Sequence, residues 1–270
     1  MSEHSFFVSP TAIQGRRADL GGQVAHQIRS VLRLRPGDRI DLLDGSGIMY
    51  VARILEISRS GVVAEVLESR RPATEPRVEL ELYQAMLKGP KMELVLQKGT
   101  EVGISRFVPV LSERCVSRPD PSDLHRRLER WRAIVREAAE QSGRALLPAV
   151  ESVESFDEAC RAAREADLAM MAWEEERGAG IRGAIRERGL AGDVPPASSR
   201  SPSVGEDVLG RRRRVALLVG PEGGFSPREA DVARDSGIRV VSLGPRILRA
   251  ETAALVASAL VLYEVGDLGG

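Results

Sequence analysis

The pattern of apolar and polar positions divides the chain into two parts. Before residue 70 it predicts mostly strands: one near Phe6 and, after a single helix, three at Arg39 to Leu43, Ile48 to Ile57 and Val62 to Leu67. The breaks at Asp44-Gly45 and Ser60-Gly61 favour tight turns, because glycine tolerates positive φ. Residues 1–72 are therefore expected to form a small β-rich domain, which a linker over residues 70–76 joins to the rest of the chain.

After the linker, strands and helices alternate. Strands are expected at Val78 to Gln84, Arg106 to Val110, Leu168 to Ala172, Val215 to Val219 and Arg239 to Leu243. Helices are expected at Lys91 to Val102, Ser122 to Gly143, Phe156 to Ala166 and Ala179 to Arg188, with two more that begin near Pro227 and Ala253. Such alternation is typical of an α/β domain with a mainly parallel sheet, here over residues 77–270.

One segment of this second part shows no periodicity. Residues 189–214 are rich in Pro, Ser, Gly and Arg and are expected to form a mobile insertion. The segment ends in four consecutive arginines, Arg211 to Arg214. They could contact RNA phosphates, or they could be a solvated charge run ahead of the apolar strand, which is the simpler interpretation.

Composition narrows the class of protein. The 39 basic and 39 acidic residues cancel, so the overall charge neither requires nor excludes a nucleic-acid partner. Cys115 and Cys160 lack the spacing of a metal site, and no metal is expected. The longest apolar stretch, Thr252 to Tyr263, is too short for a membrane span, and the N-terminus lacks signal-peptide features. We therefore expect a cytoplasmic protein without a membrane partner.

The densest chemical signal follows the strand that ends at Val219. The loop Gly220-Pro221-Glu222-Gly223-Gly224-Phe225 leads into Ser226, Pro227 and Glu229, which fit the N-cap, first-turn and capping-box positions of a helix. Glycines let a backbone approach a ligand closely, and open α/β sheets bind ligands at the carboxyl ends of their strands. The loop matches neither the phosphate-loop nor the dinucleotide pattern. A tight turn explains the glycines but not Glu222.

A second polar loop follows the strand that ends at Leu243. It contains Arg246, Arg249 and Glu251 just before the apolar last helix. The helix dipole accounts for Glu251, but two arginines at a helix N-terminus are not explained by it.

These two loops resemble a known family. GPEGGFSPREAD and LGPRILRAETAALVASALVL are similar to the two C-terminal signatures of the RsmE family, SPOUT-class enzymes that methylate N3 of a uridine in 16S ribosomal RNA. LKGPKMELVLQKGTEVGISRFVPVLSERCVSR and LERWRAIVREAAEQSGR are similar to its central blocks. Together with the N-terminal domain, the resemblance covers nearly the whole chain. Ser5 and Gly99 depart from it, because the family often has arginine and alanine there.

The resemblance implies an architecture and a cofactor. It implies a PUA-like RNA-binding β-barrel over residues 1–72, a SPOUT domain with a deep trefoil knot over residues 77–270, and S-adenosyl-L-methionine bound in that knot. It also implies a homodimer and a substrate in 16S rRNA of the small ribosomal subunit. The residues expected to hold the cofactor are Ala172, Leu218, Val219, Gly220, Pro221, Glu222, Gly223, Gly224, Leu243, Gly244, Ile247, Leu248, Arg249, Thr252 and Ala253.

Two further expectations concern the site and the last helix. A Cβ at Gly223 is expected to intrude where backbone meets cofactor. The last helix is expected to form the dimer interface, because its small residues permit close approach and a helix that is apolar on all sides must be buried on all sides. These small residues are Ala253, Ala254, Ala257 and Ala259.

Methyl transfer to uracil N3 suggests roles for the charged loop residues. The protein must align donor and acceptor, and the negative charge that develops on the uracil oxygens as N3 loses its proton can be stabilised by an arginine. Arg249 is the first candidate and Arg246 the second. Glu222 or Glu251 could take the N3 proton, or could instead fix loop geometry, and both alternatives stay open.

RNA capture is assigned to basic residues of the N-terminal domain. The expected set is Arg16, Arg17, Arg29, Arg33 and Arg35. Arg29 and Arg33 are four apart on an expected helix and so would share a face that suits phosphates, or would simply be solvated. Two alternatives to the enzyme remain: a non-catalytic RNA-binding or ribosome-assembly protein of the same fold, and methylation of a different RNA or uridine. Intact cofactor loops weigh against the first.

Overall fold

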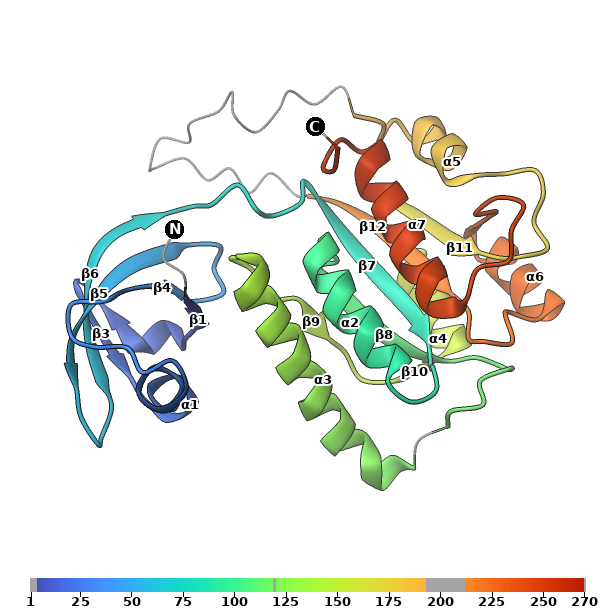
Figure 1. The fold of residues 1–270 in the computed structure, drawn as a ribbon. Coiled ribbons are helices and arrows are strands. Elements are labelled where there is room, and N and C mark those ends of the chain that lie inside the picture. Colours follow the sequence, from blue (N-terminus) through green and yellow to red (C-terminus); the bar gives the residue numbers. More distant parts are fainter. Residues whose placement is uncertain (1–3, 119, 193–211, 270) are drawn as a thin grey trace. The chain divides into compact units, whose positions relative to one another are not determined.

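The computed structural model describes residues 4–118, 120–192 and 212–269. Its contacts divide the chain into two compact units. The first comprises Met1–Glu75 and Arg136–Leu147, and the second comprises Pro76–Val135 and Pro148–Gly270. Each unit has its own sheet (Figure 1).

The first unit is built on a six-stranded sheet. Its strands are β1 (Ser5–Phe7), β2 (Ile13–Gln14), β3 (Arg17–Leu20), β4 (Arg39–Leu43), β5 (Met49–Ile57) and β6 (Val62–Arg70), in the order β1-β4-β5-β6-β3-β2. Only the β1–β4 pair is parallel among these pairings. Ile28, Leu42 and Ile54 contribute to its core. The β-rich character is confirmed.

A segment distant in sequence completes this unit. The last turns of α3 (Pro121–Ser142) supply Ala139, which packs with Phe7 and Leu43. The backbone N–H of Phe7 donates to Glu140 Oε1 over 2.9 Å. Residues 136–147 therefore belong with the strands of the first unit.

The helical turn of the first unit corrects one expectation about RNA binding. The turn η1 (Pro10–Ala12) precedes α1 (Gly22–His26), which continues into the π-helical turn η2 (Gln27–Val31). Arg33 lies beyond its end at φ 54°, and Leu34 N–H donates back to Ile28 O. Because this left-handed residue ends the helix, the prediction that Arg29 and Arg33 share a helix face is wrong.

The second unit is a parallel α/β layer structure. Its strands are β7 (Val78–Ala85), β8 (Arg106–Leu111), β9 (Ala149–Val150), β10 (Glu154–Ser155), β11 (Leu168–Ala172), β12 (Arg213–Val219) and β13 (Arg239–Val241). The order is β10-β8-β7-β12-β11-β13, with β9 beside β8, and every described pairing is parallel. The predicted parallel sheet is confirmed; the knot stays a prediction.

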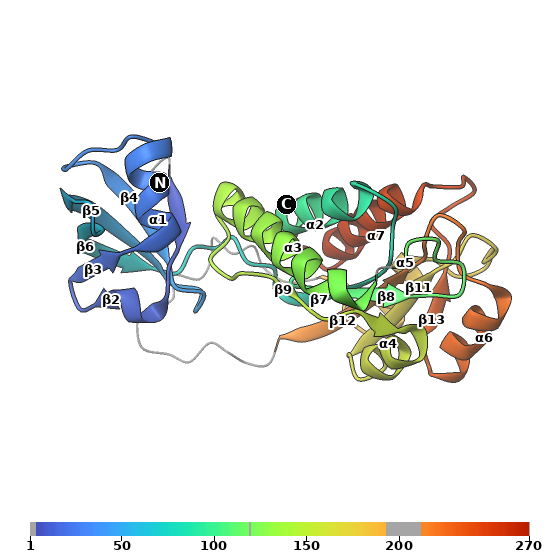
Figure 2. The ribbon, with the colours of Figure 1, turned by 90° about the horizontal axis from the view of Figure 1, so that it is seen from below.

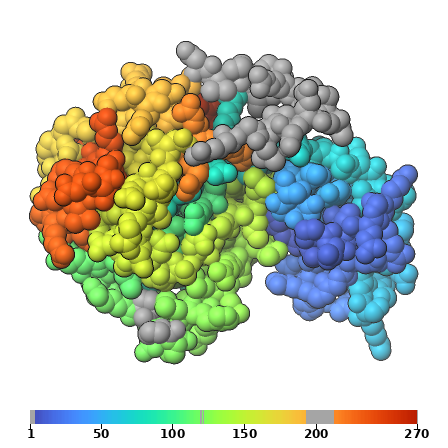
Figure 3. Space-filling model, turned by 180° about the vertical axis from the view of Figure 1, so that it is seen from behind, coloured from blue at the N-terminus to red at the C-terminus, as the bar shows by residue number. Residues whose placement is uncertain are grey.

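Helices cover both faces of this sheet (Figure 2). On one face α7 (Ala250–Glu264) packs against α2 (Lys91–Val102) and α5 (Ile181–Glu187). On the other, α4 (Phe156–Ala163) packs against α6 (Pro227–Asp235), and Figure 3 views this face. Alternate strand residues such as Tyr83 and Leu218 join the core beneath α4 and α6.

The start of β12 corrects the expected insertion. Arg213 and Arg214 belong to the strand, so the predicted segment 189–214 extends too far at this end; residues 193–211 lie outside the described residues. The Arg214 guanidinium lies 2.8 Å from Glu81 Oε1, and its backbone N–H donates to Asp167. Glu81 is buried and also lies 3.7 Å from Arg106, so Arg214 is the partner of a buried carboxylate and not part of a solvated charge run.

Helix α7 is apolar all round but is buried on one side only within this chain. Ala254, Ala257 and Val261 face the interior, whereas Leu260 and Tyr263 are 38% and 55% exposed. Ala254 and Ala257, two of the small residues expected at the dimer interface, are buried within the chain, and burial of the exposed side in a dimer stays a prediction. Among the described helices, none combines the length and apolar character that crossing a bilayer requires.

Candidate functional site

A pocket of about 360 Å³ lies where three neighbouring parallel strands end. The loops after β11, β12 and β13 form its walls, and these strands are adjacent in the sheet order. The carboxyl edge of an open α/β sheet is the usual place for a ligand. Its lining residues are Lys91, Ala172, Trp173, Glu174, Arg177, Val219, Gly220, Pro221, Glu222, Gly224, Ser242, Leu243, Gly244, Pro245, Arg246, Ile247, Leu248, Arg249, Ala250 and Ala253.

The loop after β12 is fixed by local hydrogen bonds. Ser226 Oγ accepts the Glu229 N–H at 3.2 Å, and the Glu229 side chain accepts the Ser226 N–H at 2.9 Å, so the predicted capping box is confirmed. From the neighbouring strand, the side-chain amide of Gln84 donates to Gly220 O over 3.3 Å. Gly224 adopts φ 67°, which a side chain would strain. The glycine loop is thus held before any ligand arrives.

Glu222 and Glu251 share one cation. Lys91 Nζ lies 3.2 Å from Glu222 Oε1 and 3.6 Å from Glu251 Oε2. Burial alone raises the pKa of Glu222, but hydrogen bonds from its own N–H and that of Lys88, together with the Lys91 ammonium, outweigh it and hold this pKa below its usual range. A carboxylate with a lowered pKa is a weak proton acceptor at neutral pH. The contacts of Glu222 are those of a group that ties loops together.

The two arginines of the second loop face the pocket without partners. Arg249 is the N-cap residue of α7, and its carbonyl accepts the Ala253 N–H at 2.7 Å. Neither its guanidinium nor that of Arg246 forms a hydrogen bond or ion pair with another described residue. Both charges are therefore available to a ligand.

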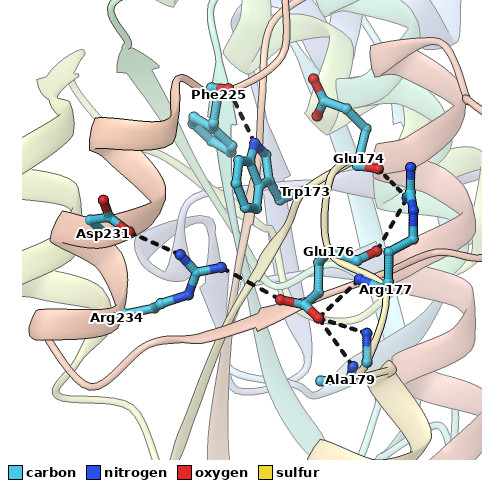
Figure 4. Close-up of polar contacts among 9 residues, drawn as sticks. Trp173, Glu174, Glu176, Arg177, Ala179, Phe225, Asp231 and Arg234 are labelled. Carbon is cyan, nitrogen blue, oxygen red and sulfur yellow. Dashed lines mark hydrogen bonds and ion pairs between the residues drawn. The ribbon is translucent and has the colours of Figure 1, made fainter.

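The loop after β11 forms the third wall of the pocket, and several polar contacts hold it in place (Figure 4). The Trp173 indole N–H donates to Phe225 O over 3.2 Å, and the Arg234 guanidinium lies 5.2 Å from the centre of the Trp173 ring. The Glu176 carboxylate accepts the Gly178 N–H at 2.7 Å and lies 3.5 Å from Arg234. The Gly178 hydrogen bond is the main reason that the pKa of Glu176 lies below its usual range.

Comparison with known proteins identifies the family of this chain. Residues 74–262 match the model of the RNA methyltransferase domain, and residues 20–67 match that of the RNA methyltransferase PUA domain. The chain belongs to this RNA methyltransferase family. It is 30% identical to ribosomal RNA small subunit methyltransferase E of Bacillus subtilis over 98% of both chains. It is 33% identical to that of Mycobacterium tuberculosis over 93% of this chain and 88% of the other.

Solved structures agree with the assignment. Ribosomal RNA small subunit methyltransferase E of Neisseria gonorrhoeae, bound to S-adenosyl methionine, superposes with a TM-score of 0.79 at 29% identity and covers 98% of this chain and 99% of its own. A putative Legionella pneumophila methyltransferase with bound S-adenosyl methionine gives 0.80 at 26% identity over 97% and 98%. The resemblance to the RsmE family is confirmed.

Most residues predicted to hold the cofactor of this methyltransferase line the pocket, but three do not. Leu218 lies in the core beneath α4 and α6, and Thr252 is exposed. Gly223 lies against Arg114, whose Nη1 donates to Gly223 O over 3.1 Å. A Cβ on Gly223 would come 3.2 Å from Arg114 Cβ, so it would meet this side chain, and the expected intrusion on the cofactor stays a prediction.

The sequence missed Lys91, Trp173 and Glu174 as site residues. Lys91 is the first residue of α2. It lies 131 positions before its partner Glu222 in the sequence, and no local pattern links the two residues. Trp173 and Glu174 directly follow the predicted Ala172, and the polar run Trp173 to Arg177 after a buried strand was the available signal.

The arginines predicted to bind RNA differ in their surroundings. Arg16 lies 3.3 Å from Glu65, and Arg17 lies 2.9 Å from Asp19. Arg29 donates to Ser58 O over 3.0 Å. The guanidinium groups of Arg33 and Arg35 are exposed and make no hydrogen bond within the described part of the chain.

Proposed function

We propose that this chain uses S-adenosyl-L-methionine to methylate N3 of a uridine in 16S rRNA of the small ribosomal subunit. The observation that carries the proposal is the three-loop pocket at the carboxyl ends of β11, β12 and β13, in a fold whose solved relatives hold S-adenosyl methionine. Its volume of about 360 Å³ is in the range of small-molecule sites. Residues 20–67 of the same chain match the PUA domain of RNA methyltransferases, which supports RNA as the substrate.

The chemistry of the lining fits this cofactor. Val219, Leu248 and Ala253 offer an apolar surface to a purine, and the glycine loop offers backbone groups at close approach. Arg246 and Arg249 offer unpaired positive charge to a carboxylate or to the reacting base. Bound S-adenosyl-L-methionine supplies an electrophilic methyl group.

The residues of the chain then have distinct roles. Arg249, and after it Arg246, stabilises the negative charge that develops on the uracil oxygens and thereby favours loss of the N3 proton. Glu222 holds its loop against Lys88 and Lys91, a role that its hydrogen bonds and lowered pKa support over that of a base. Glu251 shares the Lys91 ammonium and is assigned the same loop-holding role.

RNA capture and assembly complete the proposal. The first unit binds rRNA phosphates, with Arg33 and Arg35 as the first contacts because their guanidinium groups are free of described partners. Two copies pair through the exposed apolar residues of α7, Val256, Leu260 and Tyr263. The enzyme works on ribosomal particles in the cytoplasm.

Mass spectrometry of rRNA tests the activity directly. A strain that lacks the gene should lose one methyl group at N3 of a uridine in 16S rRNA, and expression of the wild-type chain should restore it. Loss of a methyl group from another RNA would contradict the substrate. An unchanged methylation pattern, with the cofactor shown to bind, would favour a ribosome-assembly factor.

A further inference from the structure

Glu174 carries a carboxylate in the pocket, and the proposed function gives this residue no role. It directly follows Trp173 in the loop after β11 and lines the pocket. In Figure 4 its carboxylate points away from the side chains of Glu176 and Arg177. Only its backbone carbonyl is engaged locally, by Arg177 Nη1 at 2.5 Å.

The two carboxylates that line the pocket differ in one respect. Glu222 is held by Lys91, whereas the Glu174 side chain forms no hydrogen bond or ion pair with another described residue. A carboxylate that faces a ligand site without a donor of its own is available to a donor on that ligand, and such charge-assisted hydrogen bonds are strong.

The scaffold around Glu174 keeps it in place. Trp173 is fixed to Phe225 O, and the Glu176 carboxylate gathers the N–H groups of Arg177 and Gly178 at 3.0 and 2.7 Å. These bonds lie on both sides of Glu174 in the chain, so its backbone is fixed before a ligand binds. Such support is what a recognition residue requires.

The carboxylate also contacts the cofactor loop itself. A Cβ built on Gly224 would overlap the carboxylate oxygens of Glu174. Gly224 has φ 67°, so the loop presents bare backbone at this point. Glu174 therefore lies against the loop after β12, at the wall where the cofactor is proposed to bind.

We propose that Glu174 is a cofactor-recognition residue whose carboxylate accepts a hydrogen bond from a donor on S-adenosyl-L-methionine. Three groups of that molecule offer such a donor: the ribose hydroxyls, the adenine 6-amino group and the α-ammonium. The inference rests on the proposed function, since it names a further residue of the same pocket. Arg246 and Arg249 interact with negatively charged groups of the bound ligands, and Glu174 interacts with a hydrogen-bond donor of the cofactor.

Calorimetric titration with two ligands tests this role. S-adenosylhomocysteine has the adenosine part and the ammonium, whereas 5′-methylthioadenosine has the adenosine part without the ammonium. Glu174→Gln should weaken S-adenosylhomocysteine binding by about 10- to 100-fold, the usual cost of losing a hydrogen bond to a charged group. Glu175→Gln is the matched control, because the neighbouring Glu175 is exposed and does not line the pocket.

The second ligand identifies the donor. If Glu174 binds a donor of the adenosine part, a ribose hydroxyl or the adenine 6-amino group, both ligands weaken by the same factor; if it binds the ammonium, only S-adenosylhomocysteine weakens. Glu174→Asp keeps the charge but shortens the side chain by one methylene, so it should lose less binding affinity than Glu174→Gln. It replaces Glu174→Gln in the test if that variant does not fold. A folded Glu174→Gln protein that binds both ligands as the wild type does would overturn the proposal. A wild-type protein that binds neither would overturn the proposed function as well.

Discussion

Lys91 forms an ion pair with Glu222, 131 positions further along the chain, with 3.2 Å between Nζ and Oε1. The same ammonium lies 3.6 Å from Glu251, so the start of α2 connects the loop after β12 with the first turn of α7. The positive charge of Lys91 therefore offsets the repulsion between the carboxylates of Glu222 and Glu251.

Replacing Lys91 should loosen the pocket. In Lys91→Met the carboxylates of Glu222 and Glu251 lose their shared cation, and we expect S-adenosylhomocysteine to bind about tenfold more weakly, the effect of one charge-assisted hydrogen bond. Lys98→Met is the control, because among the residues that the structure describes Lys98 pairs only with Glu101 of the same helix. Calorimetry on both variants should separate them; equal effects would contradict the linking role.

Glu222 should make stability depend on pH in one direction. Its folded pKa lies below the ordinary value of 4.5, so its stabilising contribution is present above that pH and is lost as pH falls through the folded pKa. Urea unfolding of wild type and Glu222→Gln should therefore differ at pH 7 and converge under more acidic conditions. If Glu222 were a base, the variant would instead fold normally and recover methyl transfer at high pH.

Arg249→Ala should separate catalysis from binding. Since its guanidinium has no described partner, the melting temperature should stay close to wild type, and since its proposed role is confined to the transition state, the cofactor affinity should stay within a few fold. Methylation of reconstituted small subunits at saturating cofactor should fall by about 10²–10³, as when one preorganised charge-stabilising donor is removed. Arg246→Ala is the comparison. Near-normal turnover in Arg249→Ala would move the assignment to Arg246.

The RsmE family commonly has alanine at position 99, but Gly99→Ala should destabilise this protein. A Cβ would come 2.7 Å from Ile104 Cδ1 and 2.9 Å from the Phe107 ring. Overpacking of this kind typically costs about 1–3 kcal/mol, measured as the free energy of unfolding. Ile104→Val removes the nearest methyl group, so the double variant should recover part of the loss. Additive losses would show that Ile104 is not the obstacle.

The proposed dimer depends on the exposed side of α7. Leu260→Glu places a charge among Val256, Leu260 and Tyr263 and should shift sedimentation from dimer to monomer. Val116→Glu is the control, because Val116 is also exposed but lies outside α7. A wild-type protein that sediments as a monomer at micromolar concentration would contradict the interface.

Local patterns predicted much of the second unit. The bounds of α2 and β11 were correct, because apolar periodicity and buried runs act over a few residues. The two-residue strands β2, β9 and β10 were missed, since two residues show no period. The membership of residues 136–147 in the first unit has no local signal, because it depends on contacts such as that of Glu140 with Phe7.

The candidate site was predictable where it is continuous in sequence. The signature loops supplied Glu222 and Arg249, whose neighbours carry the family resemblance. The partners of these loops come from elsewhere: Lys91 from α2, Arg114 from the segment after β8, and Trp173 from the loop after β11. Only the folded sheet brings these strand ends together, so sequence patterns alone did not reveal them.

The indole of Trp173 gives the protein a built-in optical reporter. Trp173 lines the pocket and its indole N–H donates to Phe225 O, whereas the chain's other tryptophan, Trp131, is buried in α3 and does not line the pocket. In a Trp131→Phe background, all tryptophan emission would come from the pocket wall. Occupancy of the site could then be followed in real time, without a label and during turnover.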